Sequence, residues 1–73
     1  MKVEIFYCPG RGGYDRRAAS LAAELNESTP HEAEAVSGEK SQYDVVADGK
    51  LIFSKQREGR FPEHDEIIRA LSS

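Results

Sequence analysis

The chain has 73 residues, a net charge of −3 and a single cysteine, and these properties exclude several classes of protein. At this length we expect one domain over residues 1–73, near the lower limit for folding without disulfides or metals. One cysteine rules out an internal disulfide and a cysteine-rich zinc site, which suits a reducing compartment. The negative charge argues against a nucleic-acid-binding protein. No apolar stretch is long enough for a secretory signal or a membrane span, so we expect a cytoplasmic protein. Separately, we expect a monomer.

The first half of the chain predicts a strand, a helix and a second strand. Apolar and polar residues alternate over residues 2–7, which is typical of a strand. A proline and three glycines then force a loop over residues 8–13. From Tyr14, apolar residues recur at helical spacing until Ser28-Thr29-Pro30 ends the helix. Residues 31–36 alternate weakly and are expected to form a strand before a polar loop at 37–42.

The second half predicts a hairpin and a final helix. Two β-rich runs, residues 43–47 and 50–54, flank Asp48-Gly49, a pattern that indicates a tight hairpin. Residues 56–60 are expected to form a charged loop. Pro62 fits the first turn of the last helix. Glu63, Asp65 and Glu66 suit the positive N-terminus of that helix. Its buried side is expected to be formed by Ile67, Ile68 and Leu71.

The element order β-α-β-β-β-α predicts an α/β fold with a four-stranded mixed sheet in the order 2-1-3-4 and two helices. A strand–helix–strand unit pairs its two strands in parallel, and the hairpin then extends the sheet antiparallel. This arrangement brings three loops, at 8–13, 37–42 and 55–62, to one edge of the sheet, together with the N-termini of both helices. Cys8 is expected in the middle of that edge.

Cys8 is the only residue capable of thiol redox chemistry, and two interpretations of it remain open. A thiol reacts as its thiolate, so chemistry requires exposure and a lowered pKa. The N-terminus of the helix after the glycines would favour the thiolate, and so would nearby cations. These cations are Arg11, Arg16 and Arg17, close in sequence, and Lys55, Arg57 and Arg60 from the loop after the last strand. Alternatively, Cys8 closes the strand as a small buried hydrophobe.

The loop Gly10-Arg11-Gly12-Gly13 also has two interpretations. A glycine-rich loop that runs into a helix is similar to an anion-binding nest, which would make an anion or nucleotide binder a third class of function. Its spacing, however, matches neither the dinucleotide fingerprint nor a P-loop. We favour a tight turn that needs positive φ. Tyr7 and Tyr14 flank the loop and are expected in the core.

Neither histidine predicts a metal site. His31 stands among glutamates at the start of a predicted strand, and His64 lies near the start of the last helix. With no Cys or His partner at ligand spacing, both are expected at the surface.

Two stretches of the sequence carry a family resemblance. They are Tyr7-Cys8 with a glycine-rich turn ending in Gly13-Tyr14, and the run from Tyr43 to Glu63, which holds the hairpin, the basic segment and Gly-x-Phe-Pro. Together they resemble the selenoprotein W-like proteins, also called the Rdx family. The resemblance covers nearly the whole chain. It implies a thioredoxin-like fold and thiol–disulfide redox reactions, some of them linked to glutathione.

The resemblance places Cys8 at the first position of a Cys-x-x-Cys or Cys-x-x-selenocysteine motif, but the chain departs from that motif. Position 11, the second one, is arginine, and the turn is one residue longer. The loop at 37–42 also lacks the proline that thioredoxins place opposite their active site. Without a second chalcogen Cys8 cannot cycle as a dithiol, which leaves a monothiol route released by an external thiol. Arg11 would then lower the pKa of Cys8 or receive a glutathione carboxylate.

From these arguments we expect a thiol redox protein that acts on a thiol-containing protein or on glutathione, with glutathione as co-substrate and no other cofactor. Cys8 and Arg11 are the candidate catalytic residues. The candidate binding residues are Gly10, Gly12, Gly13, Tyr14, Arg57 and Arg60. The alternative is an interaction module that keeps the thioredoxin-like fold without dithiol chemistry and binds a partner protein at the same edge.

Overall fold

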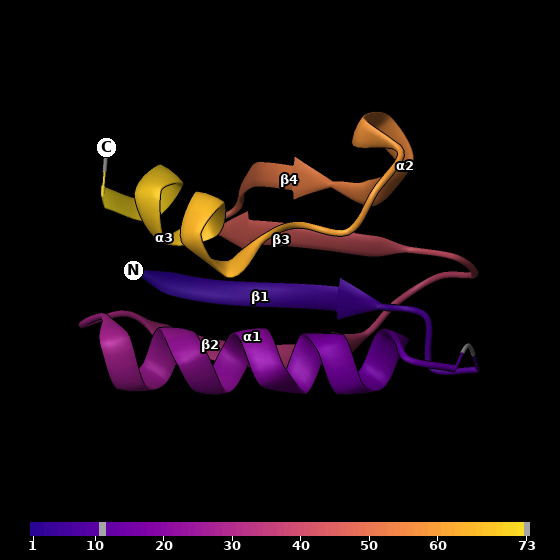
Figure 1. Ribbon diagram of the computed structural model, residues 1–73, viewed down its shortest axis with the longest axis horizontal. Helices are drawn as coiled ribbons and strands as arrows, with labels where there is room; N and C mark the ends of the chain where they lie inside the picture. The colour runs from indigo at the N-terminus through magenta and orange to yellow at the C-terminus, as the bar shows by residue number, and fades with distance from the viewer. Residues whose placement is uncertain (11, 73) are drawn as a thin grey trace.

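The predicted order of strands and helices is confirmed by the computed structural model, which describes residues 1–10 and 12–72 (Figure 1). The strands form one sheet in the order β2-β1-β3-β4, as the sequence predicts. β1 pairs with β2 in parallel and with β3 antiparallel, and β3 pairs antiparallel with β4. The elements are β1 (Lys2–Tyr7), α1 (Tyr14–Ser28), β2 (Glu32–Ser37), β3 (Tyr43–Ala47), β4 (Lys50–Ser54), α2 (Lys55–Glu58) and α3 (His64–Ser72).

The strand register brings the predicted loops to one edge of the sheet. Tyr7 lies opposite both Ser37 and Tyr43, and Asp44 lies opposite Ser54. The ends of β1, β2 and β4 and the start of β3 are therefore level with one another. The Gly38 N–H donates to the Tyr7 carbonyl at 2.7 Å and holds the loop after β2 against this edge.

The predicted hairpin is a two-residue turn between β3 and β4. Ala47 and Lys50 face each other across it. Asp48 has a φ of 50° and Gly49 a φ of 81°. Left-handed backbone at both positions matches the right-handed twist of the strands, which explains why Asp-Gly is favoured there.

α1 covers β1 and β2 with an apolar stripe at helical spacing. Its buried residues are Tyr14, Ala18, Leu21, Ala22 and Leu25, which pack in one core with Val3, Ile5 and Val45. The helix ends as predicted, with the Thr29 N–H on the Leu25 carbonyl at 3.1 Å. The Asn26 amide then binds both backbone groups of Ala33 at 2.9 Å, which joins the end of α1 to β2.

The segment between β4 and α3 differs from the prediction in two ways. Residues 55–58 form a helical turn rather than a loop, because Gly59 takes a φ of 78° and its N–H closes on the Lys55 carbonyl at 2.7 Å. α3 begins at His64 rather than at Pro62, since the Glu66 carboxylate caps the Glu63 N–H at 2.7 Å.

The N-terminus of α3 does not lie at the edge with Cys8. The chain after α2 runs back over the sheet (Figure 1), and His64 Nδ1 lies 3.6 Å from Glu24 Oε1 in the second half of α1. The prediction that both helix N-termini point to one edge is therefore correct for α1 and wrong for α3.

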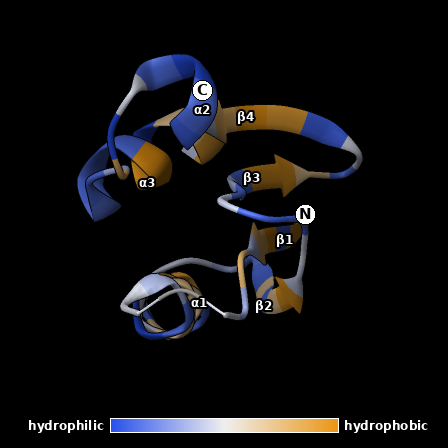
Figure 2. Ribbon diagram, turned by 90° about the vertical axis from the view of Figure 1, so that its right-hand side faces the viewer, coloured by the Kyte–Doolittle hydropathy of each residue, from blue (hydrophilic) through white to orange (hydrophobic). Residues whose placement is uncertain are grey.

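The molecule has two layers, with α1 and α3 on the same face of the sheet (Figure 2). The strands turn their buried side chains to that face. The opposite face carries the half-exposed side chains of Glu4, Phe6, Asp44 and Val46. No helix in residues 1–10 and 12–72 is long and apolar enough to cross a membrane.

Candidate functional site

Cys8 lies directly after β1, at the predicted edge, but its side chain is buried. Only 6% of the residue is exposed, and it belongs to the same core as Tyr14, Ala18 and Val45. Of the two interpretations of Cys8, its burial agrees with the small buried hydrophobe, and the exposure that thiol chemistry requires is not seen in this conformation. Because strand pairing stops at Tyr7, Cys8 no longer follows the alternation of β1, and its small apolar side chain turns into the core.

The glycine turn after Cys8 leads into α1 without a side-chain cap. Gly13 is the N-cap residue, and its φ of 86° is a conformation that only glycine adopts without cost. This agrees with the predicted positive-φ turn. Gly10 and Gly12 are exposed, and nothing lies within 4 Å of where a Cβ would stand at either. Arg11 lies outside the described residues, so its role beside Cys8 stays a prediction.

Three aromatic rings form a cluster beside the start of α1. The Phe61 ring centroid lies 5.0 Å from that of Tyr14 and 5.2 Å from that of Tyr43, and all three pairs meet edge to face. Tyr14 is in the core, as predicted, and Tyr7 packs against it half-buried. The cluster joins α1, β3 and the segment before α3.

Two cations stand over this cluster. The Lys55 ammonium lies 5.3 Å from the Phe61 centroid and 5.6 Å from the Tyr14 centroid. The Arg17 guanidinium carbon lies 4.1 Å from the Phe61 centroid. Of the cations predicted to surround Cys8, these two come together at the start of α1, and each is held by a cation–π contact.

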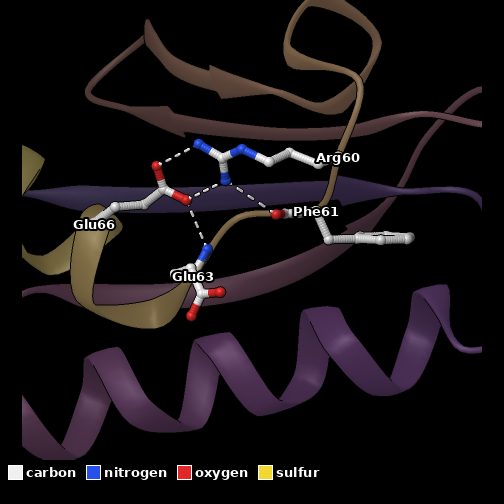
Figure 3. A network of polar contacts seen from close by, with 4 residues as sticks. All are labelled: Arg60, Phe61, Glu63 and Glu66. Atoms are coloured by element: carbon white, nitrogen blue, oxygen red, sulfur yellow. Dashed lines mark hydrogen bonds and ion pairs between the residues drawn. The ribbon is translucent and has the colours of Figure 1, made fainter.

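Arg57 and Arg60 are placed differently. Arg57 pairs with Glu58 at 3.3 Å on the exposed surface of α2. Arg60 turns toward α3 and binds both oxygens of Glu66, at 2.6 and 3.0 Å (Figure 3). This pair raises the pKa of Arg60 and lowers the pKa of Glu66 to about 2, since the guanidinium and the Glu63 N–H both favour the carboxylate. The positive charge of Arg60 is thus largely balanced by Glu66.

The loop opposite Cys8, between β2 and β3, is closed by one glutamine. Gln42 Oε1 accepts the Glu39 N–H at 2.6 Å, and its Nε2 donates to Asp44 Oδ2 at 2.8 Å. A Cβ at Gly38 would push the end of the Gln42 side chain out of place and so disturb its bond to the Glu39 N–H. The hydrogen bonds of the Gln42 side-chain amide therefore hold the conformation of this loop, at the place where thioredoxins have a proline.

Tyr43 is a functional candidate that sequence reasoning missed. Its alternation with Val45 and Ala47 predicts a core residue, and only 1% of it is exposed. Burial raises its pKa to about 12, partly offset by the charge of Arg17. Nothing in the sequence shows that Arg17, one turn into a distant helix, faces this ring. The Gly-x-Phe-Pro motif was the one signal that pointed to its neighbour Phe61.

No group of three His, Cys, Asp or Glu side chains within residues 1–10 and 12–72 is placed to hold a metal ion. His31 Nδ1 lies 3.2 Å from the N-terminal amine, and His64 faces Glu24. Ser28 and then His64 lower the pKa of Glu24 through hydrogen bonds.

Comparisons with known proteins place the chain in a family. The Rdx family profile matches residues 2–73, and the chain therefore belongs to the Rdx family. A search of curated proteins gives no match.

Two solved structures share the fold. A selenoprotein W-related protein from Vibrio cholerae is 24% identical, with a TM-score of 0.81 over 97% of this chain and 91% of that chain. A protein from Bordetella parapertussis is 23% identical, with a TM-score of 0.84 over 97% and 92% of the two chains. The protein is a thioredoxin-like member of the Rdx family.

Proposed function

We propose that the protein is a monothiol redox protein that works through Cys8, as a monomer in the reducing cytoplasm. The observation that carries the proposal is the position of Cys8 in an Rdx-family chain. It follows β1 at the edge where β1, β2 and β4 end and α1 begins. A helix N-terminus at that edge favours an anion, and a thiolate is the anion that thiol chemistry requires.

The chemistry that one sulfur supports is exchange with a mixed disulfide. The Cys8 thiolate attacks the glutathione sulfur of a glutathionylated protein, the disulfide bond breaks, and the protein leaves as a thiolate that takes up a proton. A glutathione thiolate then attacks the new disulfide on Cys8. Cys8 leaves as the thiolate, and oxidised glutathione is released. The net reaction reduces one mixed disulfide at the expense of one glutathione.

The candidate binding residues have separable roles in this cycle. Arg11 would stabilise the thiolate or hold a glutathione carboxylate, since a guanidinium binds a carboxylate through two parallel hydrogen bonds. The exposed turn of Gly10, Gly12 and Gly13 leaves room for a peptide backbone to approach. Tyr14 would supply an apolar wall, with Lys55 beside its ring.

Burial sets a condition on the cycle. With 6% of Cys8 exposed, a substrate sulfur reaches it only after the chain opens locally around it. The rate of exchange should then depend on local opening as well as on the thiolate fraction.

The test is the intact mass of the folded protein after incubation with oxidised glutathione. We expect one adduct, on Cys8, that dithiothreitol reverses. A Cys8→Ser variant should form none and should fail to speed the reduction of a glutathionylated peptide by glutathione. A wild-type protein that stays unmodified while folded, yet forms the adduct in urea, would contradict the proposal.

The burial of Cys8 favours a second candidate, an interaction module without redox turnover. The edge formed by Tyr14, residues 37–42 and residues 57–61 would hold a partner protein, and Cys8 would serve the core alone. In that case Cys8→Ser retains every partner and the same cellular phenotype. Loss of partner capture in Cys8→Ser would argue against the module.

A further inference from the structure

A cleft beside the aromatic cluster is lined by Tyr43, whose hydroxyl has no hydrogen-bond partner among residues 1–10 and 12–72. The cleft, of about 280 Å³, lies between α1, Tyr43 and the segment before α3. Tyr43 is 1% exposed, and no described residue hydrogen-bonds to its hydroxyl. Among the described residues, Asp44 Oδ1 is a fully buried side-chain oxygen without a partner, whereas the Tyr43 hydroxyl is not fully buried, and Tyr43 lines the cleft. A buried hydroxyl without a protein partner has its hydrogen-bonding capacity available to a ligand.

Two guanidinium groups that have no carboxylate partner in residues 1–10 and 12–72 line the same cleft. Arg16 and Arg17 follow each other in α1, and Ser20 lies one turn further on the same side of the helix. No carboxylate among the described residues pairs with either arginine, whereas Arg57 and Arg60 both have one. Arg17 is held 4.1 Å from the Phe61 centroid and acts electrostatically on Tyr43.

Three carboxylates lie near the cleft but are not among its lining residues. Glu24 is engaged by Ser28 at 2.6 Å and by His64 at 3.6 Å. Glu63 and Asp65 line an adjoining recess, which shares Arg17, Phe61, Pro62 and His64 with the cleft. The cleft thus combines cationic and hydroxyl groups with apolar side chains; its lining residues are Arg16, Arg17, Ser20, Tyr43, Phe61, Pro62 and His64.

We propose that this cleft binds a carboxylate carried next to an apolar group, such as the last residue of a peptide or a free N-acylated amino acid. The arginines would take the carboxylate, since guanidinium forks match its planar geometry. Tyr43 and Ser20 would donate hydrogen bonds to it, and the apolar group would rest on Phe61 and Pro62. The volume suits a single residue. The inference does not rest on the redox proposal, because Cys8 does not line the cleft.

The test is a titration of the ¹⁵N-labelled protein with N-acetyl-leucine, followed through its amide resonances. We expect saturable shifts at residues 16, 17, 20, 43, 61 and 64 and a Kd of about 1 mM, as for a small fragment. N-acetyl-leucinamide, which lacks the charge, should bind at least about 10-fold more weakly. A peptide ending in leucine that binds more tightly would assign the site to a chain terminus, and equal affinity would assign it to a free amino-acid derivative.

Variants separate the cleft from general electrostatics. Arg17→Gln and Tyr43→Phe should each weaken binding by about 10-fold, the effect of one hydrogen bond to a charged group. Lys50→Gln, which removes a charge at the hairpin end of β4, should leave the affinity unchanged. Should Tyr43→Phe fail to fold, Ser20→Ala on the exposed side of α1 takes its place, with a smaller loss of about 5-fold.

Three outcomes would overturn the proposal. The amide could bind as well as the acid, which would leave only apolar contact. Lys50→Gln could weaken binding as much as Arg17→Gln, which would indicate a response to net charge. Inorganic phosphate could bind as tightly as N-acetyl-leucine, which would indicate an unspecific anion site.

Discussion

Arg60 and Glu66 show how single residues fix the segment that closes the core. Arg60 binds both oxygens of Glu66 and also donates to the Phe61 carbonyl at 3.2 Å, while Glu66 caps the Glu63 N–H (Figure 3). One carboxylate therefore joins the start of α3 to the chain that carries Phe61. Because the pair is exposed, its contribution to the stability of the fold depends on these several hydrogen bonds rather than on burial.

This network predicts a defined pH window. The folded pKa of Glu66, about 2, lies below its ordinary value of 4.5, so its stabilisation is present above pH 4.5 and is lost as the pH falls toward 2. In thermal melts between pH 7 and pH 2, the Tm of the wild type should be higher than that of Glu66→Gln near neutrality. This difference in Tm should disappear as the pH falls toward 2. Glu63→Gln, one turn earlier, is the control and should show little gap. A Glu66→Gln gap that stays constant with pH would contradict this.

At the scale of elements, the β3–β4 hairpin is specified by two residues. Asp48 Oδ1 accepts the Lys2 N–H at 2.9 Å, and the Asp48 N–H donates to the Lys2 carbonyl at 2.9 Å. Gly49 supplies the second left-handed position. The turn thus also ties the hairpin to the start of β1.

Gly49→Ala should lower the free energy of unfolding by about 1 kcal/mol, since a Cβ is disfavoured at positive φ although space is open around it. Urea unfolding measures this. Gly10→Ala is the matched control, because Gly10 has equal space without positive φ, and should change stability by less than about 0.5 kcal/mol. Equal losses in the two variants would show that backbone conformation is not the cause.

The segment before α3 acts as an element of packing through Phe61. Phe61→Ala removes the edge-to-face contacts of the ring with Tyr14 and Tyr43 and its cation–π contact with Arg17. We expect a loss of about 2–3 kcal/mol by urea unfolding, below that of a fully buried phenylalanine. Phe6→Ala makes the same change on the uncovered face of the sheet and should cost less. A larger loss at Phe6 would contradict the assignment of Phe61 to the core.

At the scale of the whole molecule, the sheet and its order follow from local signals. The alternation in residues 2–7, the stripe from Tyr14 and the Asp48-Gly49 turn each act within a few residues, so sequence alone predicts them. The predicted start of α3 was wrong because the cap of this helix depends on the Glu66 side chain, which accepts the Glu63 N–H. The turn at 55–58 depends likewise on the conformation of Gly59.

The candidate site was less predictable because it depends on tertiary packing. The burial of Cys8 was one of two interpretations, and the sequence could not decide between them because the core around Cys8 is formed by α1, β1 and β3 together. The cleft beside Tyr43 joins residues from α1, β3 and the segment before α3, which are far apart in sequence. The sequence also did not predict which group each arginine contacts. Arg60 pairs with Glu66, and Arg17 lies over the Phe61 ring.

The central claim is that the sulfur of Cys8 reacts as a thiolate in the folded protein. The most direct measurement is the rate of Cys8 alkylation by iodoacetamide as a function of pH, in buffer and in urea. The account predicts a midpoint in buffer below the value of about 8.5 for an ordinary cysteine, with an absolute rate slower than in urea because of burial. A midpoint in buffer at or above that of the unfolded chain would contradict it.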